Sequence, residues 1–169
     1  MYNETNFHGL INVGESLFTT HQFKTTLNLI SNHLTTVTGA ERCSIFIYNK
    51  IDDELLTIMS TGIEKIQVST EKGIVGYVFR TQDSIIENNV VSNPYFLGDI
   101  DKESGYSTRN IAACPIFNSE KKIIGVLELL NKLDGFDESE LLYLNTFSNY
   151  ISSVLELAPF YLNIEKRFR

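Results

Sequence analysis

Histidine and cysteine are the residue types that most often act as nucleophiles, proton carriers and metal ligands, and this sequence has few of them. The three histidines, His8, His21 and His33, are 13 and 12 residues apart, so they form no HExxH pair. The two cysteines, Cys43 and Cys114, each lie within an apolar stretch. This spacing is not that of a zinc site or of a disulfide framework. We therefore expect no metal site and two buried, reduced thiols.

Carboxylates could bind a cation or accept hydrogen bonds from a ligand. Asp99, Asp101 and Glu103 are close together, but their spacing lacks the glycine and the terminal glutamate of an EF-hand loop, which indicates solvated side chains. Glu128 is different, because its neighbours within 126–130 are all apolar. The sequence has no GxSxG, P-loop or GxGxxG motif, and no nucleophile has an obvious base partner. These patterns predict a protein that is not an enzyme.

Length and composition predict one globular domain. The chain has 169 residues, of which 43% are hydrophobic and 21% charged. Its net charge of −7, from 21 acidic and 14 basic residues, argues against binding to nucleic acid. The sequence has no N-terminal signal segment and no apolar run near the roughly 18 residues of a membrane span. We expect a cytoplasmic protein with no membrane segment in this chain, which could itself be a piece of a larger receptor.

Apolar residues recur at helical spacing near both ends of the chain. They predict a helix within 7–18, a second over 23–37 that stops at Gly39, and a long helix over 137–157. Pro159 is expected to end or kink the long helix, because proline lacks the amide donor. The apolar stripe of the long helix has heptad spacing, and it could form a dimer seam or pack on the domain's own sheet. The members of this stripe are Leu144, Phe147, Ile151, Val154 and Ala158.

Between these helices the hydrophobic period changes to that of strands. The strand-like stretches are 43–48, 55–59, 65–68, 84–87, 111–117 and 123–131. A short helix entered through glycines is expected at 73–80. The polar stretch 88–110 has no clear period and contains several aromatic residues, so it could be a lid over a pocket or an ordinary surface loop. The pattern predicts an α+β fold, with helices from both ends on one face of an antiparallel sheet and the short helix and lid on the other.

Several segments, in order and at the right separations, resemble a GAF domain of the type found in cyclic-nucleotide phosphodiesterases and in certain bacterial adenylate cyclases. They are 71–78 (EKGIVGYV), 93–96 (NPYF), 105–111 (GYSTRNI), 114–116 (CPI) and 124–132 (IGVLELLNK). The resemblance implies a six-stranded antiparallel sheet, a buried pocket, and parallel dimers formed through terminal helices. We therefore divide the chain into an N-terminal signalling or dimerisation helix (1–22), a GAF domain (23–157) and a C-terminal linker toward a possible output domain (158–169).

The resemblance also implies a structural clasp between the last strand and the long helix. Its signature is Asn-Lys, then Phe, then an acid, which this sequence provides as Asn131, Lys132, Phe136 and Glu140. The family more often has Asp followed by Glu at the last two places, and here Leu141 takes the second of them. Lys132 could pair with Glu140 or with Asp137, and a partly exposed pair of this kind is typically worth under about 1 kcal/mol.

Carried over by position, the resemblance implies a ligand pocket lined by hydroxyl, backbone and carboxylate groups. The positions are Ser44, Met59, Ser60, Val75, Ser104, Thr108 and Glu128. Hydroxyls and backbone amides suit phosphate oxygens, and a carboxylate suits ribose or base donors. Met59 and Ser60 depart from nucleotide-binding members, which carry a stacking aromatic and then an acid at these two places. A methionine gives no stacking and no charge, so a cyclic nucleotide and another small metabolite both stay open as ligands.

The resulting interpretation is a regulatory domain of a signal-transduction protein, which senses a small ligand and relays binding through its terminal helices. The expected partners are the ligand, a second copy in a homodimer, and an output domain in cis if the chain is a fragment. One alternative is a ligand-free dimerisation module. Another is an enzyme like the free methionine sulfoxide reductases of the GAF family, which the two cysteines, located in strands and not in the lid, do not favour.

Overall fold

The computed structural model describes residues 20–60 and 66–167, so the helix expected within 7–18 lies outside the described residues. The described elements are α2 (Thr20–Thr38), β1 (Ala40–Asn49), β2 (Glu54–Ser60), β3 (Gln67–Ser69), α3 (Gly73–Thr81), β4 (Ile85–Glu87), the 3-10 helix η1 (Val90–Ser92), α4 (Gly98–Ser104), β5 (Ile111–Phe117), β6 (Ile123–Lys132) and α5 (Glu138–Arg167). Their order is the predicted one, with two additional short helices after β4.

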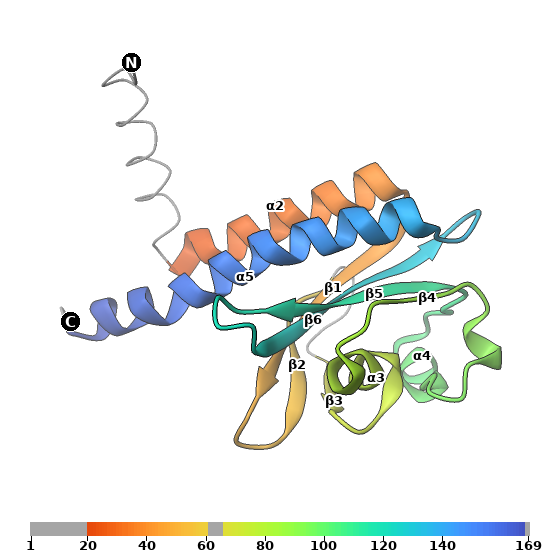
Figure 1. The fold of residues 1–169 in the computed structure, drawn as a ribbon, viewed down its shortest axis with the longest axis horizontal. Helices are drawn as coiled ribbons and strands as arrows, with labels where there is room; N and C mark the ends of the chain where they lie inside the picture. The colour runs from red at the N-terminus through yellow and green to blue at the C-terminus, as the bar shows by residue number, and fades with distance from the viewer. Residues whose placement is uncertain (1–19, 61–65, 168–169) are drawn as a thin grey trace, which may run out of the picture.

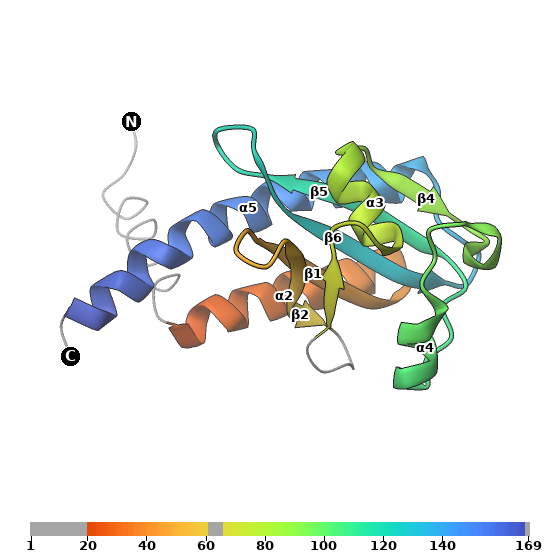
Figure 2. The ribbon, with the colours of Figure 1, turned by 90° about the horizontal axis from the view of Figure 1, so that it is seen from below.

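The six strands form one antiparallel sheet in the order β3-β2-β1-β6-β5-β4. Helices α2 and α5 lie side by side across one face, while α3 and α4 lie on the other (Figure 1 and Figure 2). This arrangement confirms the predicted α+β fold. Because β1 and β6 are paired at the centre of the sheet, their side chains reach the middle of the domain on both faces.

Alternation along the central strands produces two separate cores. On the face covered by α2 and α5, Ile45 and Leu127 are fully buried. On the opposite face, Phe46 and Val126 pack with α3. Even-numbered residues of β6 from 126 to 130 therefore face α3, and odd-numbered ones face α2 and α5. Glu128 accordingly lies on the α3 side.

The described members of the heptad stripe of α5 pack on the domain's own sheet, which was one of the two uses considered for the stripe; the side chain of Ala158 lies outside the described part of the chain. Leu144 and Ile151 are fully buried in the core beneath α5. Phe147 and Val154 are partly buried and pack against the same core. Tyr150, on the outer side of the helix, is exposed. The intramolecular core therefore accounts for the most buried members of the stripe.

The C-terminal helix is longer than the sequence indicates. Of the two outcomes expected at Pro159, an end of the helix and a kink, the first is wrong, because α5 continues through Pro159 to Arg167. A proline removes the hydrogen bond of its own nitrogen, and a helix can continue past it at that loss. Most of the segment 158–169, which we expected to be a linker, is therefore helical as far as Arg167.

Residues 88–110, which we call the lid, form a structured cover over the α3 side of the sheet (Figure 2). They contain η1 and α4, neither of which the sequence pattern indicates. Helix α4 has seven residues, too few for a periodic apolar stripe to be recognised. Asp99 and Asp101 lie in its first turn, where carboxylates are favourable, and Gly105 follows its end with a φ of +66°.

Candidate ligand pocket

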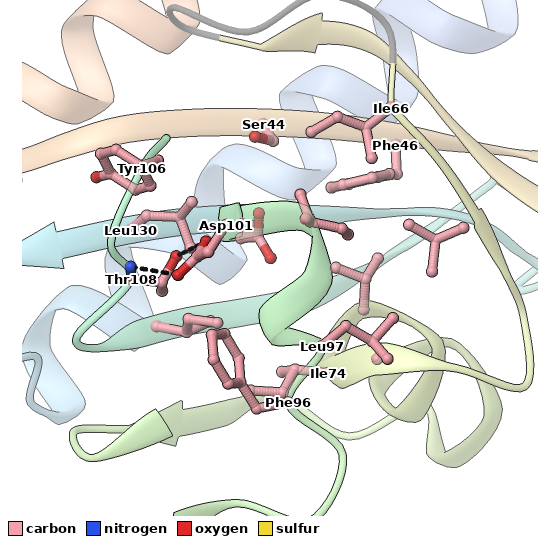
Figure 3. A pocket seen from close by; sticks show the side chains of 16 residues that line it. Ser44, Phe46, Ile66, Ile74, Phe96, Leu97, Asp101, Tyr106, Thr108 and Leu130 are labelled. Carbon is pink, nitrogen blue, oxygen red and sulfur yellow. Dashed lines mark hydrogen bonds between the residues drawn. The ribbon is translucent and has the colours of Figure 1, made fainter. Parts of the chain in front are cut away.

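A cavity lies between the sheet and the lid, on the face away from α2 and α5 (Figure 3). Strands β1 and β6 form its floor, and α3 and the lid form its walls. Most of the lining is apolar, with contributions from Phe46, Ile74, Phe96, Leu97 and Leu130. The lining is therefore suited to an apolar or aromatic group, oriented by a few polar side chains.

The polar side chains of the lining are Ser44, Asp101, Tyr106, Thr108 and Glu128. Of these, Asp101 and Glu128 carry carboxylates. The free volume of the cavity is about 70 Å³. Pockets for drug-sized ligands typically enclose roughly 300–1,000 Å³. A ligand of nucleotide size therefore enters only if the lid moves outward.

Glu128 is the charged residue on the floor of the cavity. It stands opposite Ser44 in β1 and Ala113 in β5. It is 7% exposed, and no hydrogen bond to its carboxylate is found among the described residues. Burial raises the pKa of Glu128 to about 7, and the negative charge of Asp101 adds to this effect. A buried carboxylate without a partner inside a cavity is a group that a ligand's donor can satisfy.

Ser44 and Ser60 share the pocket face of the sheet, whereas Met59 does not. The hydroxyl oxygens of Ser44 and Ser60 are 3.3 Å apart, and the two residues are partners in the register of β1 and β2. Ser60 does not itself line the cavity. Met59 is paired with Ile45 and packs in the core beneath α2 and α5. The side chain of Met59 is therefore not placed to cover the ring of a ligand in this cavity.

Asp101 and Thr108 fasten the two sides of the lid together above the cavity. The backbone N–H and the hydroxyl of Thr108 donate to the Asp101 carboxylate at 2.6 and 2.8 Å (Figure 3). The sequence indicated a solvated Asp101, because the helix α4 that turns it inward was not recognised. Ser104 is the last residue of α4, and its side chain lies outside the described part of the chain.

Helix α3 closes the cavity from the side of the glycine-rich segment. Gly73 begins the helix with a φ of +75°, and an ideal Cβ there would lie 3.1 Å from the Leu97 side chain of the lid. Glycine therefore allows the lid to pack closely at this point. Val75 is buried and lines the cavity, as the resemblance implies. The first-turn amides of a helix have no acceptor within it, so α3 offers backbone donors beside Val75.

A polar cluster at the end of the lid, which we call the mouth cluster, ties the lid to the start of β1. The Tyr106 hydroxyl, the Arg109 guanidinium and the Asn131 amide all donate to the Glu41 carboxylate, at 2.9, 2.5 and 3.1 Å. The hydrogen bond from Arg109, followed by those from Asn131 and Tyr106, lowers the pKa of Glu41 to about 2. The Arg42 guanidinium lies 3.5 Å from the centre of the Tyr106 ring. No sequence signal pointed to Glu41 or Arg42, because their partners are distant along the chain.

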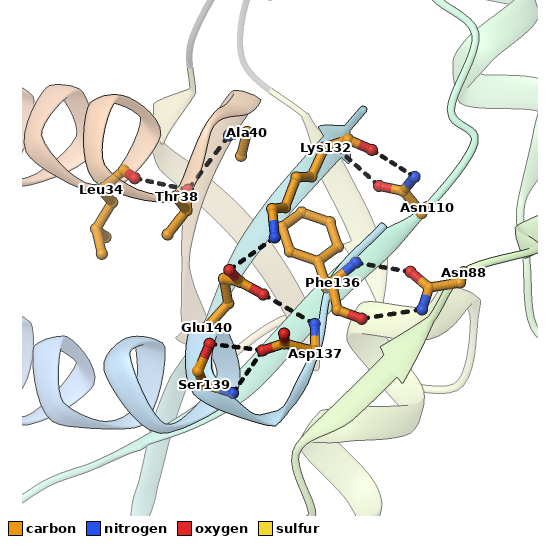
Figure 4. Close-up of polar contacts among 10 residues, drawn as sticks. All are labelled: Leu34, Thr38, Ala40, Asn88, Asn110, Lys132, Phe136, Asp137, Ser139 and Glu140. Atoms are coloured by element: carbon orange, nitrogen blue, oxygen red, sulfur yellow. Dashed lines mark hydrogen bonds and ion pairs between the residues drawn. The ribbon is translucent and has the colours of Figure 1, made fainter. Parts of the chain in front are cut away.

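The clasp implied by the resemblance is assembled at the start of α5 (Figure 4). The Lys132 ammonium donates to Glu140 at 2.7 Å, and the second oxygen of Glu140 accepts the Asp137 N–H at 2.8 Å. Lys132 thus pairs with Glu140 and not with Asp137. The side chains of Lys132 and Glu140 are only 23% and 14% exposed. Phe136 is buried, and Asn131 has a φ of +56° with a fully buried side chain.

Both cysteines lie on the far side of the sheet from the cavity. Cys43 and Cys114 belong to the core beneath α2 and α5, and neither forms a disulfide. Burial raises the pKa of each thiol to about 12. The thiolate, which is the nucleophilic form, is therefore scarce near neutral pH.

The described histidine side chain has a structural role. The His33 Nε2 lies 2.6 Å from the Tyr143 hydroxyl and joins α2 to α5. His8 lies outside the described residues, as does the side chain of His21. Within residues 20–60 and 66–167, no group of three or more His, Cys, Asp or Glu side chains is arranged to hold a metal ion. No helix in the described ranges has the length and apolar character needed to cross a membrane.

The described residues thus form an antiparallel sheet with long helices on one face and a lidded cavity on the other. The model of the GAF domain family matches residues 22–155. The chain therefore belongs to the GAF family.

Curated relatives of the chain include cyclic-nucleotide phosphodiesterases. It is 29% identical over 152 residues to a probable 3',5'-cyclic phosphodiesterase pde-5 of Caenorhabditis elegans. It is 31% identical over 108 residues to a dual 3',5'-cyclic-AMP and -GMP phosphodiesterase 11A of Takifugu rubripes. These alignments cover 81% and 55% of this chain but only 21% and 12% of the relatives. The chain thus spans about a fifth or less of the length of these proteins.

Solved structures with the same fold include the GAF domain of a phosphotransferase and a reductase. The GAF domain of an Acinetobacter phosphoenolpyruvate-protein phosphotransferase superposes with a TM-score of 0.73 at 19% identity, covering 96% of this chain and 99% of that one. A free methionine-R-sulfoxide reductase from Neisseria meningitidis gives a TM-score of 0.66 at 19% identity, covering 86% and 89%. At these identities, the likeness shows the fold alone.

Proposed function

We propose that the cavity beneath the lid binds a small molecule and that its occupancy biases the positions of α2 and α5. The observation that carries this proposal is Glu128, a buried carboxylate that faces the cavity without a partner among the described residues. Burying a carboxylate without a hydrogen-bond partner costs folding free energy, so its presence is best explained by a ligand that donates to it. Ser44 and Thr108 add hydroxyls to the same cavity.

The ligand is a cyclic nucleotide or another small metabolite with an apolar or aromatic body. Two relatives whose names refer to cyclic nucleotides support the first choice. The position of Met59 weighs against a cyclic nucleotide. Nucleotide-binding members have a stacking aromatic at this place, whereas Met59 packs in the opposite core. Ser60 supplies a hydroxyl where nucleotide-binding members carry an acid. In either case, the lid opens for entry and closes over the ligand.

The domain regulates and does not catalyse. A reductase of the kind found among its structural neighbours needs thiols that can reach the ligand. Cys43 and Cys114 are buried on the other side of the sheet, and burial raises the pKa of both. Their reduced state also suits a cytoplasmic setting. A cysteine-dependent reaction in this cavity would therefore need a rearrangement of the sheet itself.

A thermal-shift screen of the full chain with cAMP, cGMP and a metabolite library tests the proposal, using protein shown by mass spectrometry to be free of copurified ligand. A true ligand at a hundred times its Kd stabilises by about 2.7 kcal/mol. Glu128→Gln, which keeps one acceptor oxygen and loses the charge, should reduce the shift. Asn49→Ala should retain it, because the hydrogen bonds of the Asn49 side chain to described residues lie within the β1–β2 turn. The absence of a shift with every compound, or a shift that Glu128→Gln leaves intact, would count against the proposal.

A second candidate function is that of a homodimerisation module, with the remainder of a longer protein as its output. The outer surface of α2 and α5 carries an apolar groove that includes Ile30, Phe147, Tyr150 and Leu157. In this candidate, residues 1–22 act as a signalling or dimerisation helix and residues 158–169 as a linker toward the output domain. Native mass measurement checks this directly: the full chain should be dimeric, and Tyr150→Glu should make it monomeric. A wild-type monomer at high concentration would remove this candidate.

A further inference from the structure

Both ends of the lid are bound to the same short stretch of chain, residues 132–136, which comprises the last residue of β6 and most of the connection to α5. At the first end, the Asn88 side chain donates to the Phe136 carbonyl at 2.9 Å and accepts the Phe136 N–H at 2.8 Å (Figure 4). At the second end, the Asn110 side chain donates to the Lys132 carbonyl at 2.9 Å and accepts the Lys132 N–H at 2.8 Å. Each asparagine thus replaces a strand-like pair of backbone hydrogen bonds.

The two ends differ in how firmly the rest of the fold holds them. Asn110 is buried, and its carbonyl accepts the Asn131 N–H beside the β5–β6 pairing. Asn88 is exposed and follows β4, an edge strand of three residues. We call the pair of hydrogen bonds between Asn88 and Phe136 the clip. Of the two attachments, the clip is therefore the one that can shift more easily.

The contact surface of this clip is closely fitted. Gly135, directly before Phe136, has a φ of +78°, and an ideal Cβ there would lie 2.7 Å from the Asn88 Oδ1 atom. A side chain at position 135 would therefore push Asn88 away. The backbone of the connection is shaped to receive the asparagine amide.

From Phe136 the chain passes directly into α5. The next residue, Asp137, donates its N–H to Glu140, which also holds Lys132. Tyr143, in the following turn, meets His33 of α2 at 2.6 Å. A displacement of Phe136 is therefore passed to the first turns of α5 and from there to α2.

We propose that Asn88 is a positioning residue that couples the lid to α5, so that opening of the lid over the cavity loosens the first turns of that helix. This coupling rests on the proposed function for its biological meaning, since it makes occupancy of the cavity visible to the terminal helices. Physically it is a property of the protein alone, because both attachments join atoms of this chain.

Amide hydrogen exchange in the full chain tests this coupling without a ligand. Asp101→Asn loosens the lid, because an amide at this position has one acceptor oxygen for the two donors of Thr108. The readout is the exchange of amides in 138–147, the first turns of α5. We expect Asp101→Asn to raise this exchange about threefold to tenfold when Asn88 is present. In an Asn88→Ala background, the same change should leave α5 exchange unaltered.

Two further variants separate coupling from a merely structural role. Asn49→Ala also removes two side-chain hydrogen bonds, but it lies in the β1–β2 turn, so its effect and that of Asp101→Asn should be independent. Asn88→Asp keeps the acceptor for the Phe136 N–H and loses the donor, so it should leave part of the coupling. Equal effects of Asp101→Asn with and without Asn88 would overturn the proposal, as would the absence of any effect on α5. The ligand screen above can fail while this coupling stands, and the reverse also holds.

Discussion

Asp101 and Glu128 direct two carboxylates at one apolar cavity, the first from the lid and the second from the floor. Their situations differ, since Asp101 accepts two hydrogen bonds from Thr108 while no described residue donates to Glu128. The charge of Asp101 also disfavours ionisation of Glu128. The pKa of Glu128 therefore depends both on its burial in the floor and on the position of Asp101 in the lid. Measurements at different pH values can thus probe the pocket before its ligand is known.

Glu128 should make the domain less stable as the pH rises from 4.5 to about 7. Its pKa is raised from 4.5 to about 7 in the folded state, so over this interval the native protein binds the proton more tightly than the unfolded chain. Below pH 4.5 the fold has the full stabilisation that this proton provides, and above pH 7 that stabilisation is lost. Glu128→Gln, which cannot ionise, should then be more stable than wild type by up to about 3 kcal/mol. Urea denaturation of both proteins between pH 4.5 and 8 measures the difference. Curves that stay parallel across this range would contradict the prediction.

Glu41 should have the opposite dependence on pH. Hydrogen bonds from Arg109, Asn131 and Tyr106 lower its pKa from 4.5 to about 2. The stability contributed by the carboxylate is therefore present above pH 4.5 and is lost as the pH falls toward 2. Because Glu41 is exposed, we expect a small effect, confined to acid pH. Glu41→Gln should lose the part of the acid sensitivity that arises between pH 4.5 and 2, as followed by urea midpoints. Unchanged acid sensitivity in Glu41→Gln would show that the mouth cluster does not hold the carboxylate in solution.

Most of the fold was predictable, because it depends on periodic patterns. The six strands, the two long helices and the faces that they cover follow from the spacing of apolar residues. Glu128 stood out for the same reason, as a carboxylate within an apolar strand. Two features could not be predicted from the spacing of apolar residues along the sequence. Helix α4 is too short to show a period, and α5 continues through Pro159 although a proline in a periodic stretch normally predicts a helix end or kink.

The candidate site was only partly predictable. Ser44, Val75, Thr108 and Glu128 line the cavity as the resemblance implies. Met59 does not, because the register of β2 against β1 pairs it with Ile45 and directs it to the opposite core. The groups around Glu41, and the clip from Asn88 to Phe136, join residues far apart along the chain. Their chemistry is ordinary, and only the folded arrangement gives them a role.

A partly exposed ion pair typically stabilises a protein by less than about 1 kcal/mol. We expect the contacts of Glu140 with Lys132 and with the start of α5 to stabilise the domain by more than this. Both side chains are mostly buried, and Glu140 also caps the first turn of α5 through the Asp137 N–H. Glu140→Gln keeps the cap and weakens the ion pair, so it should cost about 1 kcal/mol. Glu140→Ala removes both, and a loss of about 2–3 kcal/mol is expected. Urea denaturation at neutral pH gives these values, and Glu120→Ala, in an exposed pair with Lys122, serves as the control with little effect. Equal losses for Glu140→Ala and Glu120→Ala would mean that the clasp is only a surface contact.

Gly135→Ala should destabilise the domain through Asn88, and a second glycine isolates this effect. Gly39 and Gly135 have nearly the same φ, +75° and +78°, so alanine is strained to a similar extent at both positions, by about 1 kcal/mol. No atom lies within 4 Å of an ideal Cβ at Gly39, whereas at Gly135 the Asn88 Oδ1 atom would be 2.7 Å away. Gly135→Ala should therefore cost about 1 kcal/mol more than Gly39→Ala, since the hydrogen bonds of Asn88 to Phe136 must be displaced. In an Asn88→Ala background the two glycine substitutions should have equal effects on the free energy of unfolding. If the excess at Gly135 persists without the Asn88 side chain, the strain arises from the backbone of the β6–α5 connection and not from the fit between this connection and the lid.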